Sequence, residues 1–479
     1  MPVSFSAIVP MLVVTLAGVA AMLAEAMRSS GERMPIGGLG LIGLGGAGIA
    51  SVLLWGRDAT SFGVVRADDF ALFITLLLVV VGALTIVFSF DVVERDGLPG
   101  GEYYALVMFA LAGMMLMASA TDLLVMFLAL EVLSLAVYVL TGIRRDSPSG
   151  TEGAFKYFLL GAFSSAFFLY GIAMVYVVTG STRLDRIGQV LASPATASEP
   201  LTWVAVGLLL VGFAFKVSAV PFHTWTPDAY EGAPAIVTGF MSTGVKVAAF
   251  AAFVRVFLSA LDPLRDGWSS ALWAIAIATM IVGSTVGLVQ TNIKRMLAYS
   301  SIAHAGYLLI GLVVGSAVGK SALLFYLLAY VLTNLGAFGL LAAIGTRGRG
   351  NDTLDDLTGL GTDQPRAAAL LTILLLSLGG FPPTAGFIGK WYIFSAAVQD
   401  GYYGLAIVGV LTSVVSVFYY LRIVVRMYMT PKPVGAVSLP IVPTTAMMAL
   451  AVTVAGVLLL GILPARVVEL AAQSISTIF

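Results

Sequence analysis

The sequence contains no cysteine and only two histidines, and its formal net charge is zero. Without cysteine there are no cysteine-ligated iron–sulfur clusters, thiolate metal sites or disulfide bonds. The histidines, His223 and His304, are too few and too far apart in sequence to indicate a haem or zinc site. A zero net charge gives no overall basic surface for nucleic acid. Redox-centre, disulfide-framework and nucleic-acid-binding classes are therefore disfavoured.

Charged residues are also scarce: they make up 10% of the 479 residues, whereas hydrophobic residues make up 59%. Soluble domains carry about 25% charged residues, so the composition predicts an integral membrane protein. A spanning helix needs about 20 apolar residues, and we count about fourteen such segments, which predicts an all-α polytopic fold. The segments lie near residues 4–26, 36–56, 68–91, 103–119, 121–142, 151–179, 201–230, 233–258, 269–289, 295–315, 319–345, 366–400, 402–428 and 441–465.

Two of these segments are too long for one helix and contain proline. Pro221 interrupts residues 201–230, and Pro382 and Pro383 interrupt residues 366–400. Proline removes a backbone donor, so the freed carbonyl groups must face protein or a watery cavity. Each broken segment is fourth in a run of five, and corresponding broken helices indicate an inverted-repeat transporter. We therefore expect two inverted five-helix repeats, 101–260 and 261–430, after a three-helix segment, 1–100, and before a C-terminal helix, 431–479.

The distribution of lysine and arginine over alternate connections predicts the orientation. An even number of spans places both termini on one side of the membrane. Odd-numbered connections hold thirteen Lys and Arg residues, against eight in the even-numbered connections and the C-terminal segment. Because positive charge is enriched in cytoplasmic loops, both termini are predicted to be periplasmic.

Ionisable side chains are predicted deep within the spans. A lone ammonium at mid-bilayer costs roughly 2.5–3.5 kcal/mol on translocon scales, a heavy cost for groups with only a scaffolding role. We name Glu131, Lys216, Lys246, His304 and Lys390 the titratable row. Such a row is typical of a proton pathway. Lys156 is also a candidate, although it lies nearer the start of its helix.

Glu131 and Lys216 are predicted to interact across two spans. Burial disfavours a charged lysine, whereas a neighbouring carboxylate favours it. At about 6 Å and an effective dielectric near 20, their attraction is on the order of 2.8 kcal/mol. Two opposed effects of similar size make a group that can be switched, which an arginine would not allow because it stays charged.

Each candidate also has a structural interpretation. Glu131 is then a neutral hydrogen-bonded core residue, Lys216 its static partner, and His304 a packing residue bonded to nearby hydroxyls. Lys390 is then a structural ammonium near the second break, and Lys156 extends to the membrane surface. Lys246 lies too deep in its span for that last interpretation.

Three long motifs resemble one known family. They are GFAFKVSAVPFHTWTPDAYEGAP, KRMLAYSSIAHAGY and GGFPPTAGFIGKWYIF. They closely resemble the antiporter-like subunits of respiratory complex I, the proton-translocating NADH:quinone oxidoreductase, over roughly residues 100–430. Within this family the chain is most similar to the group called subunit N, since it has Lys390 where subunit M has a glutamate.

The resemblance implies roles for the matching positions. Glu131 and Lys216 would form the coupling pair of the first half-channel, Lys246 the central relay, His304 the bridge, and Lys390 the group that exchanges protons with the outer side. Lys156 matches a family lysine whose role is less well defined, and we include it as a candidate member of the relay.

The resemblance also implies how the chain is organised within a complex. It would bind no redox cofactor, because NADH, FMN, iron–sulfur clusters and quinone would lie on other subunits. Its partners would be other membrane subunits, including a neighbouring antiporter-like subunit and small membrane subunits, in the bacterial inner membrane. Two alternatives remain open: an Mrp-type cation/proton antiporter subunit and a purely structural membrane subunit.

Overall fold

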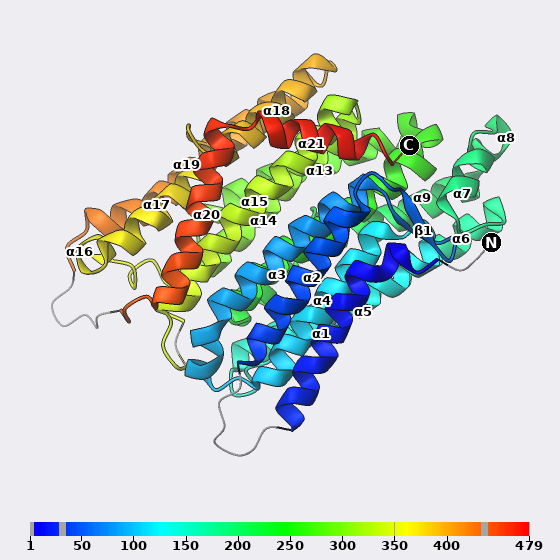
Figure 1. The fold of residues 1–479 in the computed structure, drawn as a ribbon. Helices are drawn as coiled ribbons and strands as arrows, with labels where there is room; N and C mark the ends of the chain where they lie inside the picture. The colour runs from blue at the N-terminus through cyan, green and yellow to red at the C-terminus, as the bar shows by residue number, and fades with distance from the viewer. Residues whose placement is uncertain (1–3, 28–34, 349, 433–438, 479) are drawn as a thin grey trace.

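The structure is a computed structural model that describes residues 4–27, 35–348, 350–432 and 439–478 (Figure 1). Its described part is a bundle of long helices with a single two-stranded hairpin. Twelve of the helices there are long and apolar enough to cross a membrane. They are α1 (Val9–Ala26, extended by a 3₁₀ turn), α2 (Ile36–Leu54), α3 (Asp69–Asp96), α4 (Gly100–Ser119), α5 (Leu123–Thr141), α6 (Pro148–Thr179), α11 to η3 (Ala235–Ala260), α13 (Arg265–Gly287, with its preceding turn), α14 (Ile293–Val314), α15 (Ala317–Ile344), α19 (Tyr403–Tyr428) and α20 (Thr444–Ile462).

Two further spans consist of helix pairs, as predicted. The first contains α9 (Pro200–Lys216) and α10 (Trp225–Gly232), and the second contains α17 (Pro365–Gly379) and α18 (Ala385–Gln399). Pro221 lies in the first break, and Pro382 and Pro383 lie in the second. With the twelve continuous helices, these two pairs account for the fourteen predicted spans, and the all-α polytopic fold is confirmed.

Capping residues fix where several helices begin and end. Asp68 accepts a hydrogen bond from Ala71 N at the start of α3, and Asp122 accepts from Leu124 N and Val125 N at the start of α5. These side chains satisfy donors that have no partner inside the helix. At the other end of α3, Gly97 has a φ of 64°, a left-handed conformation that glycine adopts without strain.

The end of the bundle that carries both termini has elements that the hydropathy pattern did not predict. A hairpin of β1 (Ala59–Ser61) and β2 (Val65–Ala67) lies there, with two short helices, α7 (Leu184–Leu191) and α8 (Pro194–Ala197). Helix α21 (Ala465–Ile475) crosses this end and packs against α3 and α15 (Figure 1). Ala7 N donates to Ser61 Oγ at 3.0 Å, and Phe70 N donates to Thr477 Oγ1 at 3.2 Å. The two terminal segments therefore lie on the same side, as an even number of spans requires.

Three spans form the centre of the molecule. The most apolar window of residues 235–260 is wholly buried, and those of α14 and α15 are 94% buried. α5, α6 and α19 instead turn long apolar faces outward. The central spans carry Lys246 and His304, so the fold holds these side chains away from the lipid-facing surface.

Candidate functional site

Lys246 lies at the centre of the bundle and is held by one serine. A π-helical segment, η2 (Met241–Val245), precedes it, and α12 (Lys246–Arg255) begins at it. Short π-helical segments often occur at functional positions. The ammonium donates to both the carbonyl oxygen and Oγ of Ser301 on α14, each at 2.6 Å. Only 2% of the residue is exposed.

A chain of neutral hydroxyl and amide groups continues from Ser301. Tyr330 on α15 donates to Ser301 Oγ at 2.8 Å. Asn334 Nδ2 donates to Tyr330 Oη at 3.1 Å and to Ser242 Oγ at 2.7 Å. Ser242 lies in the π-helical segment, so the chain of hydrogen bonds returns to the helix that carries Lys246. The ammonium is therefore enclosed by fixed dipoles.

His304 is bonded to tyrosines and not to lysines. Its Nδ1 lies 2.7 Å from Tyr326 Oη, and its Nε2 lies 3.2 Å from Tyr420 Oη. Tyr420 Oη also bonds Ser300 Oγ. The sequence predicted a bridge to Lys246 and Lys390, and among the described residues no hydrogen bond joins His304 to either lysine.

Aromatic rings lie between His304 and the two lysines. The Tyr330 ring lies 5.3 Å from the His304 ring and 5.6 Å from Lys246 Nζ. The Tyr307 ring lies 5.6 Å from the His304 ring and 5.2 Å from Lys390 Nζ. His304 is therefore close to both ammonium groups in space, and a proton could pass along the row only through a rotated side chain or an intervening water.

Lys390 lies at the second helix break. It is on α18, and its Nζ donates to the carbonyl oxygens of Leu378 at 2.8 Å and Gly379 at 3.2 Å, at the end of α17. Ser413 Oγ on α19 accepts at 2.7 Å. The last carbonyl groups of a helix have no partner within it and carry partial negative charge. The break therefore creates the binding site for this ammonium.

Close backbone packing at the second break leads to a testable prediction. An added Cβ at Gly386 would lie 1.9 Å from the carbonyl oxygen of Ser377, a backbone atom that cannot rotate away. Gly386→Ala is expected to push α18 from α17 and to destabilise the protein by about 1–3 kcal/mol, as overpacking does. Thermal denaturation in detergent measures this effect. Gly207→Ala, which adds a methyl group with no atom within 4 Å, is the matched control. Equal melting temperatures for the two variants would contradict the prediction.

Lys216 is the last residue of α9, at the first break. Its Nζ donates to Ser134 Oγ on α5 at 2.7 Å. The rings of Tyr138 and Tyr157 lie 5.8 Å and 5.6 Å from this nitrogen. Only 5% of the residue is exposed. Like Lys246 and Lys390, the other lysines of the row, it forms no ion pair with a carboxylate in the described part of the chain.

Glu131 lies one helical turn before Ser134 and is half-buried. It accepts a hydrogen bond from Ser165 Oγ on α6 at 2.6 Å. Ser134 takes the place next to the Lys216 ammonium that the sequence assigned to the Glu131 carboxylate. Among the described residues, Glu131 and Lys216 are therefore each bonded to a serine and not to one another.

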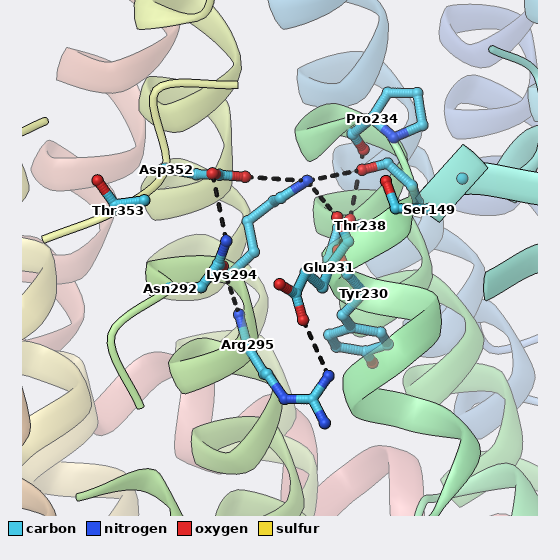
Figure 2. A network of polar contacts seen from close by, with 12 residues as sticks. Ser149, Tyr230, Glu231, Pro234, Thr238, Asn292, Lys294, Arg295, Asp352 and Thr353 are labelled. Atoms are coloured by element: carbon cyan, nitrogen blue, oxygen red, sulfur yellow. Dashed lines mark hydrogen bonds and ion pairs between the residues drawn. The ribbon is translucent and has the colours of Figure 1, made fainter. Parts of the chain in front are cut away.

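Lys156 lies outside the titratable row. Its side chain is 42% exposed and pairs with Glu152 on the same helix and with Asp228 on α10, both at 2.7 Å. Asp228 also binds Arg295, and Arg295 binds Glu231. Figure 2 shows the part of this set around Lys294. Its Nζ donates a hydrogen bond to the carbonyl oxygen of Glu231 on α10 and forms an ion pair with Asp352 at 3.1 Å. We name this set the charged network: Lys156, Asp228, Glu231, Lys294, Arg295 and Asp352.

Reasoning from the sequence missed most of this network and a buried ion pair. Arg255 donates to both carboxylate oxygens of Asp68 at 2.8 Å, and their side chains are 3% and 0% exposed. Lys294 and Arg295 counted only as loop charges in the topology argument. The signal that could have revealed the network was the sequence Pro-Asp-Ala-Tyr-Glu after the first break, because acidic groups at a break need cationic partners.

Fold and buried polar groups together define a polytopic helical membrane protein with two broken spans and lysines at its centre. A family model described as NADH:quinone oxidoreductase/Mrp antiporter, transmembrane, matches residues 120–416. The NADH-quinone oxidoreductase subunit N of Trichlorobacter lovleyi is 45% identical over 99% of this chain and 98% of its own length. That of Chloroflexus aggregans is 43% identical over the same shares. The chain belongs to this family and, within it, to the subunit N group.

Solved structures agree with this assignment. A chain of respiratory complex I from Thermus thermophilus with bound aureothin matches with a TM-score of 0.82 and 37% identity, covering 97% of this chain and 99% of that one. A chain of the Mrp complex from a Dietzia species matches with a TM-score of 0.84 but only 21% identity, over 99% and 97% of the two chains. The second similarity shows a shared fold alone.

Proposed function

We propose that the chain is a proton-translocating membrane subunit of a NADH:quinone oxidoreductase. The observation that carries this proposal is that Lys216, Lys246 and Lys390 are all buried and are held by neutral oxygens. Desolvation opposes the charge on a buried lysine, and in the described part of the chain no carboxylate hydrogen-bonds to any of these three lysines. Such an amine can lose its proton when a nearby charge changes, which a proton relay requires.

The helices that carry these groups support an order of proton transfer along the row. Glu131 and Lys216 serve the first half-channel, in the repeat 101–260, and Lys390 serves the second, in the repeat 261–430. Lys246 receives protons between the halves, and His304 passes them on through its tyrosine partners. The segments 1–100 and 431–479 complete the bundle around these repeats.

Lys156 takes a different part in this proposal. Its ion pairs with Glu152 and Asp228 keep it charged at the end of the bundle opposite the termini. A lysine held by two carboxylates is less able to release a proton than one held by neutral groups. We assign it to the charged network at that end and not to the relay itself.

The subunit N relatives and the likeness to a chain of respiratory complex I support a place for the chain in such an assembly. Other membrane subunits, including an antiporter-like neighbour and small subunits, flank the chain. NADH, FMN, iron–sulfur clusters and quinone are held by other subunits, so that this chain carries out no redox chemistry. The bacterial inner membrane is the location, with both termini periplasmic by the excess of positive charge in the odd connections.

Lys216→Met in the assembled complex tests the proposal. Electron transfer to quinone is expected to continue, whereas the number of protons moved per electron falls, because methionine cannot carry a proton. The assay is NADH oxidation and acidification of inverted membrane vesicles, measured together. Lys216→Arg is the matched control, and it is expected to fail like methionine because arginine stays charged. Unimpaired pumping by both variants would support the purely structural alternative.

Sodium dependence separates the proposal from the antiporter alternative. A redox-driven proton subunit is expected to acidify vesicles equally in sodium and potassium buffers when NADH is supplied. An Mrp-type subunit would move protons in response to a sodium gradient without NADH. Proton movement driven by sodium alone, and lost in Lys246→Met, would favour the antiporter.

A further inference from the structure

The charged network joins the second half of the first broken span to the start of α14. Arg295, in the first turn of α14, donates to Asp228 Oδ1 at 2.7 Å and to Glu231 Oε2 at 2.9 Å, both on α10. Lys294 Nζ donates to the carbonyl oxygens of Glu231 at 2.6 Å and Ala233 at 3.0 Å (Figure 2). A cation at a helix C-terminus is favoured by the helix dipole. Four hydrogen bonds therefore tie the end of α10 to α14.

The other end of α10 contacts the surroundings of Lys216. Trp225, its first residue, stacks on Tyr157 with ring centroids 4.1 Å apart. The indole Nε1 of Trp225 donates to the carbonyl oxygen of Phe215 at 3.2 Å. Tyr157 lies 5.6 Å from Lys216 Nζ, and Phe215 is the residue before Lys216. A short rigid helix therefore touches the Lys216 site at one end and α14 at the other.

α14 carries the connection on to Lys246. Ser301, which holds the Lys246 ammonium, follows Arg295 by six residues, a rise of about 9 Å along the helix. Among the described residues no hydrogen bond joins Lys216 to Lys246 directly. α10 and the first turns of α14 therefore form a continuous series of contacts between the surroundings of Lys216 and those of Lys246.

We propose that Arg295 and Lys294 are positioning residues that fix α14 to α10, so that a displacement of α10 on a change at Lys216 moves Ser301 relative to Lys246. This inference rests on the proposed function of the row. Neither cation contacts a row lysine, so their effect passes through the helices. Asp352 also holds the start of α14 in place, because its carboxylate pairs with Lys294 and its carbonyl oxygen accepts a hydrogen bond from Ile293 N at 2.6 Å.

A double-mutant cycle in the intact complex tests this role. The variants are Arg295→Gln, Lys246→Met and the combination of the two, and the measurement is protons moved per electron in inverted vesicles. Arg295→Gln is expected to lower the ratio toward that of Lys246→Met while NADH oxidation and subunit content stay normal. The double variant is expected to be no lower than Lys246→Met, because residues that act through one another are not additive. Arg295→Lys, which keeps the charge, is expected to recover part of the ratio.

The matched control is Arg426→Gln, which removes another arginine–aspartate pair, Arg426 with Asp355 at 3.5 Å. It is expected to leave the ratio unchanged. An unchanged ratio in Arg295→Gln, or a double variant that falls by the sum of the single effects, would overturn the positioning role. If Lys246→Met alone keeps the full ratio, the proposed function fails, which is a different result. Should Arg295→Gln not assemble, Glu231→Gln removes one carboxylate partner and undergoes the same cycle.

Discussion

Lys246→Met is expected to stop proton transfer between the two halves of the row without destabilising the protein. Methionine has a similar length but carries no proton. The described residues give the ammonium neutral partners only, so its removal leaves no unpaired charge among them, and Ser301 Oγ keeps its hydrogen bond from Tyr330 at 2.8 Å. A lone ammonium at mid-bilayer costs roughly 2.5–3.5 kcal/mol, so the variant is expected to melt at the same temperature or higher.

Two measurements check this prediction: proton uptake per electron in vesicles, and thermal melting of the purified complex. A loss of pumping together with unchanged or raised thermal stability identifies a group kept for its function. Lys246→Arg is the matched control, which keeps the positive charge and is expected to lose pumping as well. A variant that loses stability but keeps its proton-to-electron ratio would show that Lys246 has a structural role.

Hydropathy and proline positions predicted the fold because both are local properties, which depend only on residues that are neighbours in the sequence. The long apolar segments became helices, and the prolines at 221, 382 and 383 fell inside the two breaks. The hairpin β1–β2 and helix α21 were not predicted, because elements this short do not form an apolar run long enough to span a membrane. Their places are set by tertiary contacts, such as the hydrogen bond from Ala7 N to Ser61 Oγ in β1 and the packing of α21 against α3 and α15.

Positions within the site were predicted less well than the residues themselves. Depth in a span can be estimated by counting residues, but the rotation of one helix against another depends on packing. Ser134 and Glu131 lie one turn apart, and packing places the serine against Lys216. In the same way, four tyrosines gather around His304, three of them bringing their rings to within 5.8 Å of its ring. Tyr307 belongs to the sequence motif around His304, but nothing in that motif marks the other three tyrosines, which lie on α15 and α19.

The lysines of the titratable row and the cations of the charged network differ in their partners. Lys216, Lys246 and Lys390 bind hydroxyl and carbonyl oxygens. Lys156 and Arg295, toward the end of the bundle, bind carboxylates. Ion pairs hold their charge and so hold helices in place, whereas neutral partners leave an amine free to change its protonation. This contrast separates the groups that we propose to move protons from those that we propose to position helices.

Two ion pairs at the end with the termini allow a direct comparison of burial. Asp68 and Arg255 are almost fully buried, whereas Asp58 and Arg66 have side chains 56% and 32% exposed and lie 2.6 Å apart. The hydrogen bond from Arg66 lowers the pKa of Asp58 below its ordinary value. Solvent screens the exposed pair, so breaking it is expected to cost at most about 1 kcal/mol. Asp58→Asn is therefore the control for the buried pair.

Asp68→Asn is expected to destabilise the protein by about 3–5 kcal/mol, because it leaves the Arg255 guanidinium buried without a counter-ion. Asparagine can still cap α3, so the effect reports the lost charge. Arg255 ends the helix that begins at Lys246, about 13 Å away, so the loss also loosens the outer end of that helix. Thermal loss of this subunit from the purified complex measures the effect. Asp68→Asn with Arg255→Gln is expected to be milder than Asp68→Asn alone, since the buried charge is then removed, and equal melting of Asp68→Asn and Asp58→Asn would contradict this account.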